Sequence, residues 1–146
     1  EDMNVTIKEV IKETKKAVDI TDAKVLVSGG RGIGSADYYK ELQKVADLLG
    51  GEISSSRANV DAGWIAKDRQ VGQTGKTVRP DLYLACGISG AIQHIAGMEN
   101  SECVISINKN DTAAIFDVSD LGIVGDVKVI IPKLIDALTK YKAAQN

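Results

Sequence analysis

The stretch AKVLVSGG at residues 23–30 decides the fold. Its Val-rich apolar run ends in two glycines, which predicts a buried strand followed by a tight turn. The next segment, ADYYKELQKVADLL at 36–49, repeats apolar residues at spacings of three and four and runs into Gly50–Gly51. This spacing predicts an amphipathic helix that ends at a glycine. A strand followed by a helix is the building unit of α/β domains.

Strand patterns recur along the rest of the chain. Further strands are predicted at 51–56 (GEISSS), 81–87 (DLYLACG) and 103–108 (CVISIN), with one or two short strands within 115–126 (IFDVSDLGIVGD). Strands that are apolar along their whole length favour a mainly parallel sheet covered by helices on both faces. The expected fold is therefore a three-layer α/β domain, a variant of the Rossmann type that binds nucleotides.

Helix patterns separate these strands. One helix is predicted over 90–98 with Ser89 as its cap, and a last helix over 126–140 with Pro132 in its first turn. Residues 57–80 show little periodicity and are predicted as a loop with at most one short helix.

The N-terminal residues differ from this pattern. Residues 3–18 are charged, with scattered apolar positions, and predict a short strand or an amphipathic lead-in. The chain begins with Glu1 rather than Met, so we expect a processed or excised piece. The predicted division is 1–22 as the remnant of a preceding domain and 23–146 as the main domain.

Composition limits the function classes. The chain has 146 residues, a net charge of −2 and a pI near 5.4, which argues against binding nucleic acid through bulk positive charge. No stretch approaches the ~20 apolar residues of a membrane span. The two cysteines, Cys86 and Cys103, lie in apolar runs without metal-ligand spacing and are predicted to be buried, reduced thiols.

Small and polar residues follow the predicted strands. They occur at 28–32 (SGGRG), 54–57 (SSSR), 87–90 (GISG) and 108–109 (NK). In parallel sheets, ligands bind at the carboxyl ends of the strands. Glycine backbone, hydroxyls and two arginines at that edge predict a ligand that carries phosphate.

Two nucleotide motifs fit incompletely. The dinucleotide pattern G-x-G-x-x-G begins at Gly30, but Ser35 occupies the position of its third glycine. The segment 72–77 (GQTGKT) ends like a phosphate-binding P-loop, but Gln70 stands where the first glycine belongs and no apolar strand precedes it. Neither a standard NAD site nor a P-loop is therefore predicted.

Few side chains suit catalysis. A single histidine, His94, disfavours a histidine metal site or a Ser/His/Asp triad, and it reads either as a core residue or as a group near the ligand. The aspartates between 111 and 126 read as turn and helix-cap residues, with one of them able to contact ribose or adenine.

Taken in order, these segments resemble the C-terminal FAD-binding domain of the electron transfer flavoprotein alpha subunit. The resemblance covers residues 24–140, and its two most specific pieces are QVGQTGK at 70–76 and GISGAIQH at 87–94. It is supported by VSGGRG at 27–32, SSRANVDAGW at 55–64, AGM at 96–98, INK at 107–109 and GIVGD at 122–126. The resemblance implies FAD as cofactor and residues 23–146 as the FAD-binding domain.

The resemblance also implies the site. Arg57 would lie over the flavin ring near its reactive nitrogen, Thr74 would donate a hydrogen bond to that nitrogen, and His94 would face the pyrimidine carbonyl. The implied FAD contacts are Arg31, Ser56, Arg57, Val71, Gly72, Gln73, Thr74, Ser89, Gly90, Ala91, Ile92, Gln93, His94, Asn108, Asp126 and Val127. Within this set, phosphate and ribityl contacts fall to Arg31, Ser56 and Asn108, and adenosine contacts to Asp126 and Val127.

The implied function is electron transport without substrate turnover of its own, so no catalytic residue and no metal are expected. The implied partners are an electron transfer flavoprotein beta subunit and acyl-CoA or other dehydrogenases, in the bacterial cytoplasm or, in a eukaryote, the mitochondrial matrix. Two alternatives stay open: a redox-inactive module that binds ADP or NAD, and a piece that only docks a partner subunit.

Overall fold

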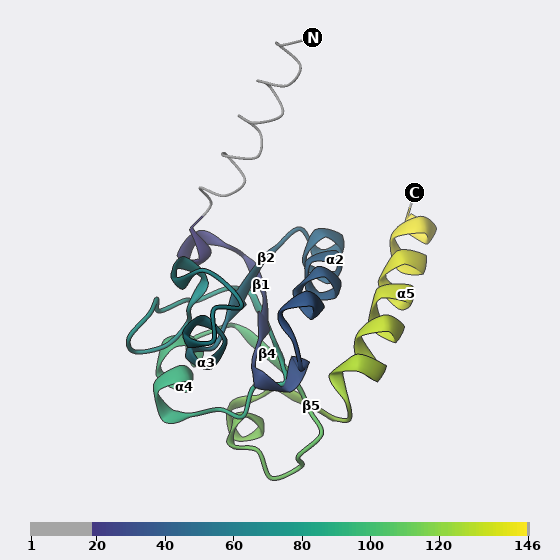
Figure 1. Ribbon diagram of the computed structural model, residues 1–146. Helices are drawn as coiled ribbons and strands as arrows, with labels where there is room; N and C mark the ends of the chain where they lie inside the picture. Colours follow the sequence, from purple (N-terminus) through teal and green to yellow (C-terminus); the bar gives the residue numbers. More distant parts are fainter. Residues whose placement is uncertain (1–18, 146) are drawn as a thin grey trace, which may run out of the picture.

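A five-stranded parallel sheet forms the centre of the computed structural model, which describes residues 19–145 (Figure 1). The predicted lead-in at 3–18 lies outside the described residues. The strand order is β2-β1-β3-β4-β5. The strands are β1 (Val25–Gly29), β2 (Glu52–Ser55), β3 (Leu82–Cys86), β4 (Cys103–Asn108) and β5 (Leu121–Val124).

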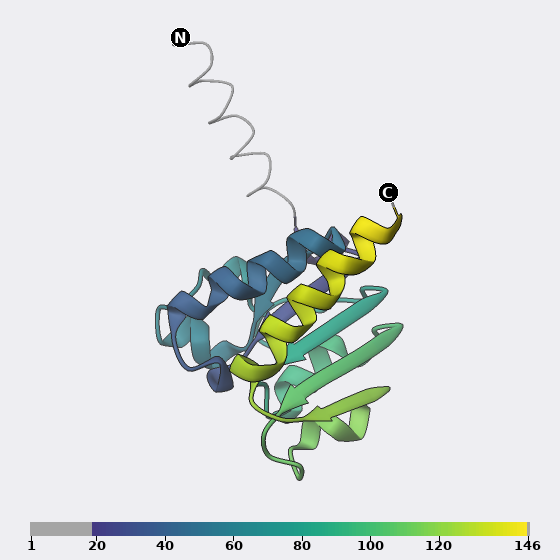
Figure 2. The same cartoon turned by 90° about the vertical axis from the view of Figure 1, so that its right-hand side faces the viewer.

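Helices cover both faces of the sheet, which confirms the predicted three-layer architecture. The helices α2 (Tyr39–Leu49) and α5 (Val127–Gln145) lie side by side on one face (Figure 2). The helix α4 (Ile92–Met98) lies on the opposite face (Figure 1). A short helix, α3 (Arg57–Asp61), follows β2 within the segment that the sequence predicted as mostly loop.

The three central strands, β1, β3 and β4, contribute to two hydrophobic cores because successive side chains point to opposite faces. Leu26 of β1 and Tyr83 of β3 pack on the α4 side, together with Ile20 from the turn before β1. Val27 and Leu84, the next residue in each strand, pack beneath α2 and α5. Burial on both faces explains why these strands read as continuous apolar runs.

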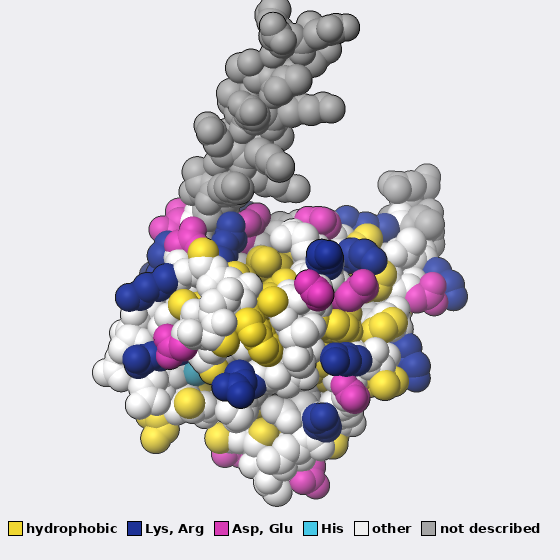
Figure 3. Space-filling view, in the orientation of Figure 1, with side chains coloured by type: hydrophobic (Ala, Val, Ile, Leu, Met, Phe, Trp, Pro, Cys, Tyr) yellow, Lys and Arg dark blue, Asp and Glu magenta, His cyan; other side chains and the backbone are white. Residues whose placement is uncertain are grey.

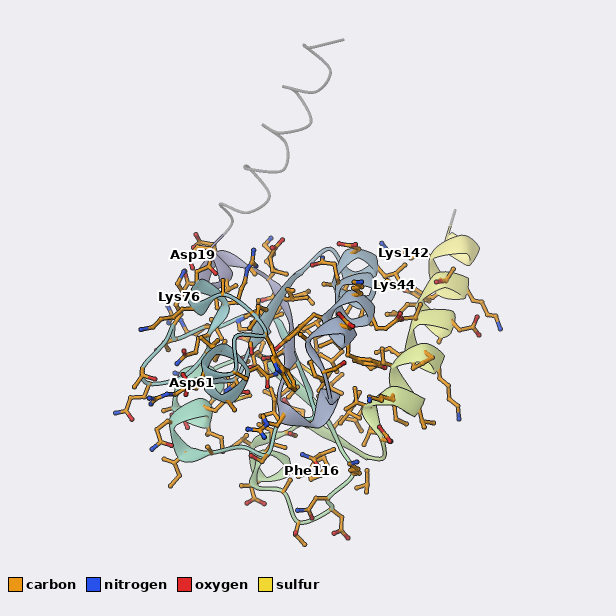
Figure 4. The ribbon with its side chains drawn as sticks, in the orientation of Figure 1. Asp19, Lys44, Asp61, Lys76, Phe116 and Lys142 are labelled. Carbon is orange, nitrogen blue, oxygen red and sulfur yellow. The ribbon has the colours of Figure 1, made fainter. Side chains whose placement is uncertain are left out.

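An ion pair ties the start of the described chain to the α4 side of the molecule. The Lys76 ammonium lies 3.0 Å from the Asp19 carboxylate, and both residues are labelled in Figure 4. This contact joins the turn that precedes β1 to the segment that follows α3.

Two sequence predictions, the Ser89 cap and the burial of Cys103, need correction. Ser89 does not cap α4, because Gly90 has a φ of +93° and the helix begins only at Ile92, with the Ser89 carbonyl accepting a hydrogen bond from the Ile115 amide. Residues Ala114–Val118 form a 3-10 turn anchored by the buried Ile115, so 115–126 holds one strand, β5, which agrees with the one or two strands predicted there. Both cysteines are unpaired thiols as predicted, but Cys103 is only half-buried.

The start of the last helix differs from its prediction as well. Helix α5 begins at Val127, and the Asp126 carboxylate accepts a hydrogen bond of 2.9 Å from the Lys128 amide. Pro132 therefore lies in the second turn rather than the first. Proline at that position removes one amide donor, which the long helix tolerates on its exposed side.

Candidate functional site

A cleft of about 490 Å³ opens at the carboxyl ends of the strands. It lies where the chain reverses its direction of winding, since β1 connects outward to β2 and the next connection returns to β3 on the other side of β1. Such switch points are the usual ligand sites of doubly wound sheets, and the volume suits a small-molecule ligand.

Glycines form the floor of the cleft. The Gly30 amide donates to the Cys86 carbonyl at 2.9 Å, and the Gly32 amide donates to the Gly87 carbonyl at 3.0 Å. A Cβ atom on Gly30 would lie 2.5 Å from the Gly87 oxygen. The turns after β1 and β3 can therefore touch only because side chains are absent, and this contact leaves backbone exposed to a ligand.

A tight loop at residues 70–76 forms one wall. It is tied to β2 by a hydrogen bond of 2.9 Å from the Val71 amide to the Ser55 carbonyl, and to α4 by one of 2.8 Å from the Gln73 amide to the Gln93 carbonyl. These two bonds join segments that are distant in the sequence. They hold the 70–76 loop next to the GISGAIQH segment, so that both segments line the cleft.

Most of the predicted contact residues line this single cleft. The lining members of the predicted set are Arg31, Ser56, Arg57, Val71, Gly72, Gln73, Thr74, Ser89, Gly90, Ala91, Gln93, His94 and Asn108. Three predicted contacts lie outside it. The Ile92 side chain is 83% exposed, Asp126 caps α5, and Val127 is buried in the core beneath α2 and α5.

Several lining residues were not among the predicted FAD contacts. They are Gly30, Gly32, Ala58, Gln70, Gly87 and Ile88. The glycines stand in the strand-end turns that the sequence did flag, so their position was a usable signal. Gln70 opens the flagged QVGQTGK segment, but its own contact with Thr74 depends on the fold of the loop around it.

Polar side chains in the cleft differ in how many hydrogen-bonding groups remain available to a ligand. The Gln70 side-chain amide donates to the Thr74 hydroxyl at 3.0 Å, which leaves the Thr74 proton for another acceptor. Asn108 is committed internally, because its amide donates to the Ile88 carbonyl at 2.9 Å and its oxygen accepts from the Asn110 amide at 2.9 Å. Asn108 therefore holds the turn after β3 in place.

The cleft carries positive charge at its rim. Arg31 is exposed, and the Arg57 guanidinium lies 3.3 Å from the Asp61 carboxylate, with both of these paired side chains 65% exposed. An exposed pair of this kind is worth little, so Arg57 can reorient toward an anionic ligand at small cost. Lys and Arg side chains on the face shown in Figure 3 are dispersed rather than gathered into one patch.

His94 lies beneath the rim and is only 6% exposed. Its Nε2 atom is 2.7 Å from the Tyr83 hydroxyl, and its Nδ1 atom is buried without a regular hydrogen-bond partner among the described residues. Burial lowers the pKa of His94 to about 4, and the nearby Val71 backbone opposes part of that shift. The imidazole is therefore neutral at pH 7 in the ligand-free chain.

This neutral histidine predicts a loss of stability in mild acid. The folded pKa of about 4 lies below the ordinary value of 6.5, so the unfolded chain binds the proton more tightly. The contribution of His94 to the free energy of unfolding is complete above pH 6.5 and disappears as the pH falls toward 4, a loss on the order of 3 kcal/mol. Urea unfolding between pH 7 and 4 checks this. His94→Gln should be the flatter of the two curves, and parallel curves would contradict the assignment.

The described residues limit other kinds of site. Within residues 19–145, no group of three His, Cys, Asp or Glu side chains is placed to hold a metal ion. None of the helices in that range combines the length and apolar character that crossing a membrane requires.

A doubly wound parallel sheet with a glycine-floored cleft at its switch point defines a nucleotide-binding class of α/β domain. Within that class, residues 19–99 match the family described as the electron transfer flavoprotein FAD-binding domain. The chain belongs to this family, as the resemblance in its sequence predicted.

Curated relatives agree with this family. The chain is 55% identical over 141 residues to the electron transfer flavoprotein subunit alpha of Thermoanaerobacterium thermosaccharolyticum, covering 97% of this chain and 43% of the relative. It is 51% identical over 148 residues to the acryloyl-CoA reductase electron transfer subunit beta of Anaerotignum propionicum, covering 99% and 40%. It is 50% identical over 138 residues to the mitochondrial alpha subunit of Dictyostelium discoideum, covering 93% and 39%. The chain thus spans about two fifths of the length of these relatives.

Proposed function

We propose that the cleft binds one FAD non-covalently and that the chain contributes this cofactor to an electron carrier. The observation that carries the proposal is the meeting of two distant segments. Residues of QVGQTGK and of GISGAIQH line one cleft at the switch point of the sheet. Membership of a family described as FAD-binding supports the choice of ligand.

The residues present fit such a ligand. Close backbone approach at Gly30 and Gly87 suits an extended cofactor lying against the floor. The Ser56 hydroxyl and the His94 Nδ1 atom are buried polar groups without a regular partner among the described residues, and both residues line the cleft. Buried polar atoms of this kind are usually satisfied, so a polar ligand at the cleft would give them partners.

The chain's own residues then divide the work. Arg31 and Ser56 would hold phosphate and ribityl groups, while Arg57, Thr74 and His94 would border the ring. The bound flavin supplies the one-electron and two-electron redox chemistry, and the protein supplies orientation and electrostatics. Positive charge from Arg57 favours the reduced, more negative cofactor.

The proposal extends to the assembly. We propose that a beta subunit covers the open side of the cleft, and that acyl-CoA or other dehydrogenases deliver the electrons. The compartment would be the bacterial cytoplasm or the mitochondrial matrix. The exposed Ile92, whose neighbours Ala91 and Gln93 line the cleft, offers an apolar contact for a covering subunit.

The identity of the ligand is open to a direct test. We expect the purified chain, after reconstitution with FAD, to be yellow and to release about one FAD per chain when denatured, as measured by chromatography of the supernatant. The control is the same reconstitution with FMN, which lacks the adenosine half and should be retained poorly. FMN retained as well as FAD would contradict the proposal. A colourless chain that binds ADP would favour the redox-inactive nucleotide module.

A further inference from the structure

The hydrogen-bond partner of His94 in the sheet is Tyr83, and the contact between the two side chains has no role in the function described so far. Tyr83 stands in β3 and is fully buried, while His94 stands in α4 and lines the cleft. The phenol oxygen and Nε2 are 2.7 Å apart, with ring centroids separated by 6.0 Å and planes inclined by 55°. This is a short hydrogen bond between two rigid elements of the fold.

The direction of this hydrogen bond follows from the protonation states of the two groups. Burial raises the pKa of the Tyr83 phenol, which therefore keeps its proton, and burial keeps the His94 imidazole neutral. A neutral imidazole has one nitrogen that accepts and one that donates. Whether Nδ1 carries the proton is therefore determined once it is known whether Nε2 accepts or donates.

The surroundings of the phenol favour donation to Nε2. The other polar groups beside it are the Ser28 and Ser54 hydroxyls, and both serines are fully buried. Neither serine has a regular hydrogen-bond partner among the described residues. The His94 Nε2 atom, 2.7 Å from the phenol oxygen, is therefore a better acceptor for the phenol proton than either serine hydroxyl.

We propose that Tyr83 is a positioning residue that fixes the tautomer of His94, donating its phenol proton to Nε2 so that the imidazole carries its own proton on Nδ1. His94 then offers a donor, not an acceptor, on its unpaired side next to Val71 at the cleft. A ligand atom at that position must be an acceptor, such as a carbonyl oxygen. Only this last step rests on the proposed function, because the tautomer is a property of the ligand-free chain.

The chain's single histidine makes the tautomer directly measurable. In the ¹⁵N-labelled, flavin-free chain at pH 7, a long-range proton–nitrogen correlation spectrum reports which imidazole nitrogen is protonated. We expect Nδ1 protonated and Nε2 bare, with a preference on the order of tenfold, since a typical hydrogen bond is worth about that much. A wild-type chain protonated on Nε2 would overturn the proposal without any variant.

Tyr83→Phe removes only the hydroxyl. The tautomer preference should fall to within about threefold, and the two nitrogen shifts should move toward each other, since the hydrogen bond that selected one form is gone. Tyr38→Phe is the matched control, because the Tyr38 hydroxyl donates to the Val127 carbonyl at 3.2 Å and does not contact His94. An unchanged preference in Tyr83→Phe, or an equal loss in Tyr38→Phe, would overturn the proposal. Absence of flavin binding would leave these spectra unaffected, so the two proposals fail separately.

Discussion

Gly87→Ala is expected to destabilise the chain by roughly 2–5 kcal/mol and to abolish retention of the cofactor. Gly87 has a φ of +68°, which an alanine adopts only with strain. A Cβ atom there would also lie 2.7 Å from the Gly32 Cα atom, so the turns after β1 and β3 would have to separate. Their contact is the floor of the cleft. A domain whose total stability is about 5–15 kcal/mol would lose a large share of it.

Gly63→Ala is the matched control for this variant. Gly63 has a similar φ of +78°, but a Cβ atom there would have no neighbour within 4 Å. The loss of stability in Gly63→Ala should reflect backbone strain alone, about 1–2 kcal/mol, and the variant should retain flavin. Urea unfolding of both variants measures the difference. Equal losses of stability, with flavin kept in both, would show that the cleft floor tolerates a side chain.

The fold was largely predictable because buried parallel strands carry a strong local signal. The runs around Val27 and Leu84 are apolar on both faces, and α2 shows a regular apolar stripe that ends at Gly50 with a φ of +72°. The errors arose where tertiary contacts decide the backbone. Ser89 has the composition of a helix cap, but its carbonyl is bonded to Ile115, a residue far along the chain, and Gly90 turns the chain before α4 begins.

The candidate site was predictable in part for a topological reason. In a parallel sheet, every strand ends at the same edge, so the turns after Gly29, Ser55 and Cys86 come together whatever their spacing in the sequence. The specific roles came from the resemblance to a family. The contact between Tyr83 and His94 had no sequence signal, because it joins the second residue of β3 to the first turn of the short helix α4.

Arg57→Ala should make the bound flavin harder to reduce, lowering its midpoint potential by about 60–130 mV. The change follows from losing a charge-assisted hydrogen bond of about 1.5–3 kcal/mol, with about 59 mV for each 1.4 kcal/mol in a one-electron step. Arg57 lines the cleft, and within residues 19–145 its ion pair is with the exposed Asp61 alone. Water screens such a charge, so the lower end of this range applies where the guanidinium stays as exposed as it is in the ligand-free chain.

Redox titration of the reconstituted chain measures the shift, and Arg79→Ala is the matched control. Arg79 is also exposed, but it does not line the cleft, so its removal changes the net charge by the same amount without a local contact. Its effect on the potential should be small and should vanish at high salt, because distant exposed charges are screened over about 10 Å at 0.1 M ionic strength. The Arg57 shift should persist in high salt. Equal shifts in the two variants would show that Arg57 acts through net charge and does not contact the ring.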